Sequence, residues 1–321
     1  MRNTYLSLVI FLINIVCSAK TFAKNTADTA TIYYSFKWEP TTEENASFLS
    51  KQWTEKGLFY QYDFYYPLLI PQMTGSYSDP ERKKMEGTFI YYHPNGAKKD
   101  SITYLKNAAN GTAIGWFDNG QMSYRSKFKN GILVDTSYAW YESGKKNGII
   151  ICDQKGNGVG QEFSETGQKI GGGNFTSGKR NGIWTFNDDN KIVSQIIKYE
   201  MDSVKSITNF DEKGNKEKGT KSIETIPEFK GGINGWRRFL ERNLQYPESA
   251  QKDGIQGVVR LKFIVGKDGK PYNIKINNAP DKALANEALR IMSLSPDWIP
   301  ATKYNREVSY YYYQTITFAF Q

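Results

Sequence analysis

Histidine and cysteine, which often carry acid–base, nucleophilic or metal chemistry, are scarce in this sequence, with one histidine and two cysteines. His93 is the only histidine, and it stands in the turn-like stretch YYHPNG without cysteine or carboxylate partners at the spacing of zinc ligands. A Ser-His-Asp triad is formally possible, but no nucleophile elbow accompanies it. The glycine cluster GNGVG at 156–160 lacks the spacing of a dinucleotide-binding loop and indicates a turn. We therefore predict a protein that is not an enzyme and has neither a cofactor nor a metal site.

The first residues have the pattern of a secretory signal peptide. Arg2 precedes an apolar run from Leu6 to Val16, and Ala19 and Ala23 are possible cleavage points. This run is shorter than the about 20 residues that a spanning helix needs. We expect residues 1–23 to be a signal peptide that exports the chain. An uncleaved membrane anchor is the alternative.

The cysteine content and the charge distribution argue against a disulfide-stabilised fold and against a nucleic-acid-binding protein. Cleavage would leave Cys152 as the single thiol, so no internal disulfide framework is expected. Its neighbours in GIIICDQKG form an apolar, strand-like run, which indicates a small buried hydrophobe. The net charge is +9, but basic residues are scattered along the chain. Because a nucleic-acid-binding surface would cluster them on one element, we predict no nucleic-acid partner.

A repeat fills the middle of the chain. An aromatic pair or single ring, a polar pair and a turn residue recur in YYHPNG, GWFDNG, AWYESG, EFSETG, TFNDDN and NFDEKG. These stretches end 23 or 24 residues apart, at Gly96, Gly120, Gly144, Gly167, Asn190 and Gly214. Asn-Gly and similar pairs supply the positive φ of tight hairpin turns. The composition, rich in tyrosine and glycine, also favours strands and turns.

Each repeat predicts two short strands with one buried face, and stacked hairpins can bury a face that one hairpin cannot. The units resemble MORN-type repeats. The resemblance covers about 57–219, with residues 24–56 as an N-terminal segment or cap, and it implies an extended β-sheet scaffold. Which repeat face binds a partner is left open.

The pattern changes after residue 219. Residues 220–226 are predicted to be a linker and 227–321 a separate domain. Its predicted order is helix, strand, strand, helix, strand, and PESAQKDG is predicted to be a second short helix. Trp236, Phe239, Leu240 and Leu244 have helical spacing, KDGK is a hairpin turn, and Asp281 is a predicted helix cap. The last helix has a predicted buried stripe of Leu284, Ala288, Leu289, Ile291 and Met292. WIPATKYNRE is predicted to be a loop before the closing strand.

This second domain resembles the C-terminal domain of TonB, the energy transducer of Gram-negative envelopes. The similarity rests on PEFKGG, LQYP, IQGVVRLKFIVGKDG, EALRIM, WIPA and TITFAF, in that order over residues 227–320. The fold class is therefore mainly β plus α+β: a β-hairpin array followed by a three-stranded sheet with packed helices.

The resemblance implies binding by strand addition, in which a segment of an outer-membrane receptor pairs with the free edge of the sheet. It places the Tyr-Pro element beside the partner and makes the last strand, about 308–317, the edge. Alternation should point Tyr310 and Tyr312 to one side and Tyr311 and Tyr313 to the other. The candidate partner-binding residues are Gln245, Tyr246, Pro247, Val308, Tyr310, Tyr311, Tyr312, Tyr313 and Thr315.

One departure from TonB keeps three hypotheses open. The chain has 11 prolines and no Pro-rich run that could form a spacer across the periplasm. The first hypothesis is a periplasmic binding protein associated with TonB-dependent transport. The second is an anchored energy transducer, and the third is a structural envelope protein that self-associates, for example as a homodimer.

Overall fold

The computed structural model describes residues 29–219 and 221–320, so the predicted signal peptide lies outside the described residues. The chain divides into two compact units. The first extends to Thr185 and includes Ile197–Ser206, and the second comprises Phe186–Ile196 together with the chain from Ile207 onward.

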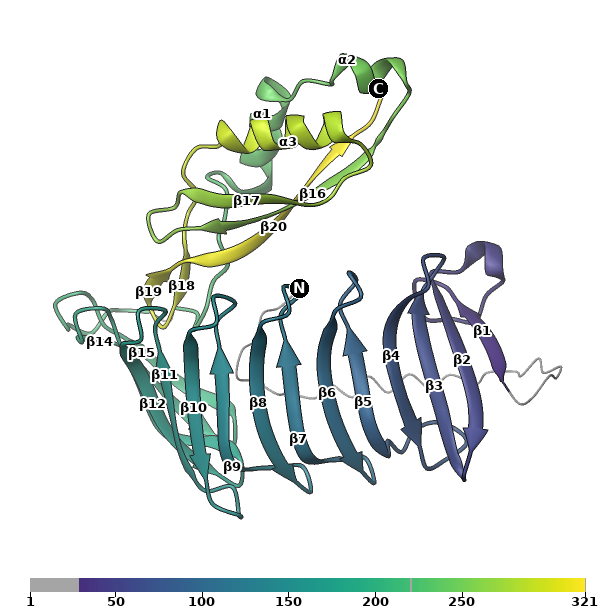
Figure 1. Cartoon of the computed structure of the whole chain (residues 1–321). Coiled ribbons are helices and arrows are strands. Elements are labelled where there is room, and N and C mark those ends of the chain that lie inside the picture. Colours follow the sequence, from purple (N-terminus) through teal and green to yellow (C-terminus); the bar gives the residue numbers. More distant parts are fainter. Residues whose placement is uncertain (1–28, 220, 321) are drawn as a thin grey trace. The chain divides into compact units, whose positions relative to one another are not determined.

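Fifteen antiparallel strands form one sheet, in which each strand lies beside its neighbours in sequence (Figure 1). The sheet begins before Gly57, because the first two strands already pair with each other. The predicted domain bounds themselves stay predictions. The strands are β1 (Ala30–Tyr34), β2 (Phe48–Glu55), β3 (Leu58–Tyr65), β4 (Ile70–Tyr77), β5 (Gly87–Tyr92), β6 (Lys98–Leu105), β7 (Ala108–Trp116), β8 (Met122–Lys129), β9 (Ile132–Trp140), β10 (Lys146–Cys152), β11 (Gly158–Phe163), β12 (Lys169–Thr176), β13 (Lys179–Asn187), β14 (Val193–Glu200) and β15 (Ser203–Asn209); a short 3-10 helix, η1 (Glu43–Asn45), lies between β1 and β2.

The predicted turn residues have the expected backbone conformation, with one correction. Gly96, Gly120, Gly144, Gly167 and Gly214 all have φ near +80°. In the fifth repeat, however, the left-handed residue is Lys191 (φ 66°) and not Asn190. Its amide donates to the carbonyl of Asp188, as the amide of Gly96 donates to that of His93. The turn therefore keeps its geometry although a lysine occupies the position that favours glycine.

Turn side chains connect successive repeats. The amide of Asn95 donates to the carbonyl of Asp118 (2.9 Å), and that of Asn119 donates to the carbonyl of Glu142 (3.3 Å). His93 takes part in the same ladder, because its Nε2 lies 2.9 Å from the carbonyl oxygen of Trp116. His93, Asn95 and Asn119 thus serve stacking, since each hydrogen-bonds to the backbone of the following repeat.

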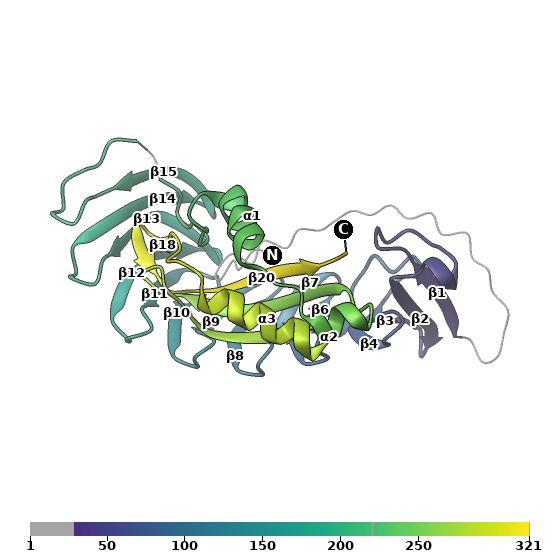
Figure 2. The ribbon, with the colours of Figure 1, turned by 90° about the horizontal axis from the view of Figure 1, so that it is seen from above.

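Within the second unit, three strands form a smaller sheet in the order β17-β16-β20. The helices α1 and α3 lie on one face of this sheet (Figure 1, Figure 2). The Asp281 side chain caps α3 by accepting from the amides of Ala283 and Leu284, as predicted. The elements are α1 (Gly232–Asn243), α2 (Glu248–Lys252), β16 (Gly257–Val265), β17 (Pro271–Asn278), α3 (Lys282–Ser293) and β20 (Tyr310–Phe318).

The core of this unit lies between the sheet and the helices. It contains alternate residues of β16 and all of the predicted α3 stripe except Leu289, which is 36% exposed. Leu289 stands at the edge of the helical stripe, so it misses the sheet. The fully buried members are Ala250, Val259, Leu261, Phe263, Val265, Leu284, Ala288, Ile291, Met292 and Ile316, and Phe229, Trp236, Trp298 and Phe318 complete the core.

The stretch WIPATKYNRE is not simply a loop, because it contains a short hairpin of β18 (Ala301–Lys303) and β19 (Arg306–Val308). The two residues between these strands both have positive φ, 55° at Tyr304 and 60° at Asn305, as a two-residue hairpin turn requires. The predicted linker also pairs with this hairpin, since the amide of Thr225 donates to the carbonyl of Thr302 (2.8 Å).

Among residues 29–219 and 221–320, no helix has the length and apolar character needed to cross a membrane.

Candidate functional site

The closing strand β20 lies at one edge of the three-stranded sheet. It pairs with β16 over nine successive positions without a register shift, from Gly257 opposite Phe318 to Val265 opposite Tyr310. No other strand of the described chain pairs with the far side of β20. A regular edge of this length offers a row of backbone donors and acceptors that an added strand can use.

The opposite edge, β17, is much less regular. Its pairing with β16 shifts register twice, and Asn273 within it has a left-handed backbone (φ 52°). Bulges of this kind twist an edge and interrupt the ladder, which protects it from further pairing. The two edges therefore differ, and β20 is the one suited to accept a strand.

The four consecutive tyrosines of β20 alternate between the two faces, as expected. The Tyr312 ring packs in the core, 5.9 Å from Phe263 and 5.3 Å from Trp298 between ring centroids. Tyr310, two residues away, shares this face and is half-buried, and burial raises the pKa of its hydroxyl. Tyr311 and Tyr313 face the other way, where the Lys262 ammonium lies 5.2 and 5.5 Å from their ring centroids.

Of the predicted partner-binding residues, Val308 lies outside the edge strand and Thr315 lies on it. Val308 lies outside β20, in β19, where it pairs with Ala301, so the regular edge begins at Tyr310. Thr315 lies on β20 directly opposite Arg260 and is exposed.

The Gln245–Pro247 segment lies at the Phe318 end of β20. The Tyr246 ring stacks on Phe320 (4.9 Å between centroids) and meets Phe318 edge-on (5.8 Å), while its hydroxyl donates to the carbonyl of Ile255 (2.5 Å). Pro247 immediately precedes α2. Tyr246 is thus part of the intramolecular packing that fixes the end of the edge strand, and contact with a partner stays a prediction.

A buried carboxylate holds this segment, and the sequence analysis missed it. Glu287 of α3 is 8% exposed and accepts from the backbone amide of Gln245 (2.8 Å). Arg290 donates to both Glu287 oxygens (2.7 Å each) and to the carbonyl of Asn243 (2.6 Å). The carboxylate also raises the pKa of Arg290. The i, i+3 spacing of Glu287 and Arg290 was a signal for the ion pair, but their contact with 243–245 depends on tertiary structure.

Residues 242–320 match the family of C-terminal regions of Gram-negative bacterial TonB proteins. The match begins within α1 and ends just after β20, so it contains the edge strand, Tyr246 and Glu287. It covers less than half of the chain and leaves out the fifteen-stranded sheet, whose likeness to MORN-type repeats stays a hypothesis. No curated protein matches the chain with significance.

The match carries coarse functional information. Domains of this family occur in the periplasm and cell envelope, are not enzymes, and interact with proteins such as outer-membrane receptors. It therefore associates this chain with TonB-dependent transport.

Proposed function

We propose that the chain is a periplasmic binding protein whose TonB-like domain captures an extended segment of an outer-membrane receptor by strand addition to β20. The added strand would pair with the backbone from Tyr310 to Phe318. Backbone hydrogen bonds supply the affinity in this mode, and no catalytic group is required.

The observation that carries the proposal is the difference between the two sheet edges. β20 pairs with β16 without interruption, whereas the pairing of β17 with β16 is bulged. Natural proteins usually shield a long regular edge, because it invites pairing with other chains. Here the edge is kept regular, and the Glu287–Gln245 contact together with Tyr246 stacking holds its Phe318 end in place.

Backbone-modified peptides test strand addition without altering the protein. An extended peptide from a candidate receptor would be N-methylated on alternate residues, in two versions that together cover every residue. Only one edge of an added strand bonds to β20, so one version should lose binding by about tenfold or more while the other keeps it. Binding would be measured by fluorescence anisotropy on the full mature chain.

Amide chemical shifts locate the binding site. The largest shifts on titration should fall on β20, with β17 as the internal control. Equal affinity of the two methylated peptides, or shifts confined to β17, would contradict strand addition at β20.

A further inference from the structure

The three strands of the small sheet carry basic residues and no acidic ones. β16, β17 and β20 contain Arg260, Lys262 and Lys275 but no aspartate or glutamate. The acidic residues nearest in sequence are Asp268, Asp281 and Glu307, all outside the three strands. Asp268 stands in the β16–β17 turn, 3.9 Å from Lys270. The charged side chains of the three strands are therefore all positive.

All three basic side chains lie on the face opposite the helices, called here the open face. Val259, Leu261 and Phe263 of β16 are fully buried in the core, so Arg260 and Lys262 must point the other way. Ile274 and Ile276 of β17 pack against the same core, which places Lys275 on the open face. Arg260 and Lys275 are exposed, and Tyr272 (46%) and Tyr313 (47%) share this face.

Two of these charges oppose each other directly. Lys262 and Lys275 are Cα partners on neighbouring strands. Like charges at such positions destabilise a sheet, and the contact of the Lys262 ammonium with the Tyr311 and Tyr313 rings brings no negative charge to this face. An anionic group over the open face would offset the repulsion.

Resting on the proposed function, we propose that the strand added to β20 is acidic on one face, with carboxylates at alternate positions over the open face. Side chains at these positions would lie beside Tyr311, Tyr313 and Thr315. Thr315 is small and lies directly opposite Arg260. A glutamate of the added strand beside Thr315 could therefore extend over the threonine side chain and reach the Arg260 guanidinium. The distance spans two strand spacings, about 10 Å, which an extended glutamate and an extended arginine can bridge together.

Three short peptides test this charge preference. Each alternates valine with one other residue, which is glutamate, glutamine or lysine, over about nine positions, the length of a strand like β20. At about 50 mM salt the glutamate peptide should bind the full mature chain about tenfold more tightly than the glutamine peptide, and the lysine peptide should bind most weakly. The difference should shrink at about 500 mM salt, because the charges are exposed.

Substitutions identify the residues responsible. The combined variant Arg260→Gln, Lys262→Gln and Lys275→Gln should bind the glutamate and glutamine peptides alike, with the affinity for the glutamine peptide kept. Arg260→Gln alone should remove part of the preference for the glutamate peptide over the glutamine peptide. Because Arg260 is exposed, this single variant replaces the triple variant in the test if the triple variant folds poorly. The matched control is Arg237→Gln, Lys252→Gln and Lys282→Gln, which removes the same charge from exposed positions on the helices and should leave the preference intact.

The outcomes separate this inference from the proposed function. Equal binding of all three peptides by the native chain, or a preference that survives the triple variant, overturns the acidic-strand proposal and leaves strand addition standing. If none of the three binds and the receptor-derived peptides also fail, strand addition is wrong and this inference fails with it.

Discussion

At the scale of single residues, two polar side chains make contacts that hold the fold together. His93 links two repeat turns, and Glu287 anchors a backbone amide. A buried carboxylate is costly unless it is paired and hydrogen-bonded, and Arg290 with the Gln245 amide meets that need. The result is a fixed position for the segment that precedes Tyr246, next to the end of the edge strand.

Cys152 gives a residue-scale prediction. The side chain is buried in β10, and burial raises the pKa of its thiol from 9.0 to about 11. A two-unit shift leaves about a hundredfold less thiolate near neutral pH, and thiolate is the reactive form. A thiol reagent should therefore label the native chain at least about tenfold more slowly than the chain in denaturant.

The raised pKa of the Cys152 thiol also makes the stability of the fold depend on pH. Because the folded-state pKa is raised, the stabilising contribution is fully present below about pH 9 and is lost as the pH rises through about 11. Rapid labelling of the native chain near neutral pH would contradict this assignment.

At the scale of elements, aromatic rings and glycines on neighbouring strands build the buried face of the large sheet. Trp184 and Phe89 are fully buried. A Cβ added to Gly173 would lie 2.4 Å from the Trp184 ring, and one added to Gly75 would lie 2.3 Å from the Phe89 ring. These glycines are needed for close approach of a ring and not for a turn, which distinguishes them from the turn glycines of the repeat motif.

Gly173→Ala tests this packing. The added methyl group would force the Trp184 ring out of place and lower the free energy of unfolding by about 1–3 kcal/mol. Asn174→Ala, at an exposed neighbouring position, is the control and should change it by less than about 0.5 kcal/mol. Urea unfolding followed by tryptophan fluorescence measures both, and equal effects would refute the role of the glycine.

At the scale of the whole molecule, the chain passes between the two compact units inside β13, between Thr185 and Phe186, and again inside β14 and β15. The segment Phe186–Ile196 belongs to the C-terminal unit, where the β18–β19 hairpin packs against it. Tyr304 stacks on Phe186 (3.4 Å between centroids), and its carbonyl accepts from the Ser194 hydroxyl (2.7 Å).

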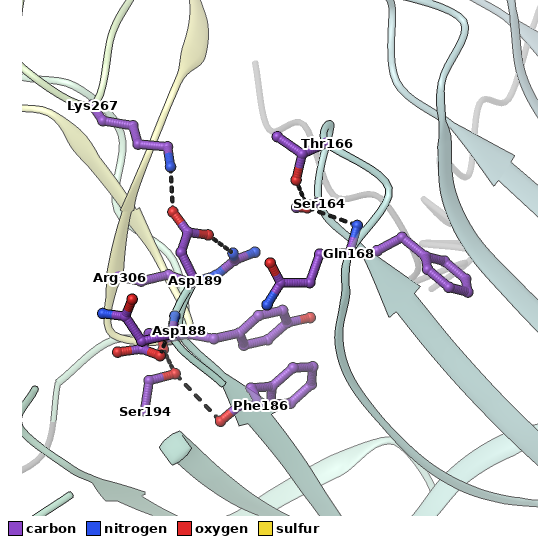
Figure 3. Close-up of polar contacts among 12 residues, drawn as sticks. Ser164, Thr166, Gln168, Phe186, Asp188, Asp189, Ser194, Lys267 and Arg306 are labelled. Atoms are coloured by element: carbon purple, nitrogen blue, oxygen red, sulfur yellow. Dashed lines mark hydrogen bonds and ion pairs between the residues drawn. The ribbon is translucent and has the colours of Figure 1, made fainter. Parts of the chain in front are cut away.

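Charges support the same packing. Figure 3 shows Lys267 and Arg306 pointing toward Asp189, which Lys267 contacts directly and Arg306 approaches to 3.7 Å. The hydrogen bond from Lys267 lowers the pKa of Asp189. All of these groups are within the C-terminal unit, so the turn of the fifth repeat and the TonB-like domain share one packed region.

Tyr304→Ala tests whether this region unfolds as one. Removing a buried ring should destabilise the C-terminal unit by about 3 kcal/mol and speed amide exchange in residues 186–196 and 301–308 together. Tyr272→Ala, which removes an exposed ring, is the control and should leave exchange there unchanged. Unchanged protection of 186–196 in the Tyr304 variant would show that the two segments open independently.

The sequence by itself determined most of the local structure. The spacing of turn residues predicted the hairpin array because positive φ is a local requirement. Alternation predicted the two faces of β20, and Asp281 predicted the start of α3, for the same reason. The order of motifs also led to the TonB-like domain, which the family match confirms.

Only the tertiary structure decided what depends on residues distant in the chain. It showed that Val308 leaves the edge strand, that the WIPATKYNRE stretch forms a hairpin against Phe186, and that Glu287 holds Gln245. It also placed Lys262 opposite Lys275 across two strands. Such pairings depend on register and packing between separate elements, which no local pattern of residue types can specify.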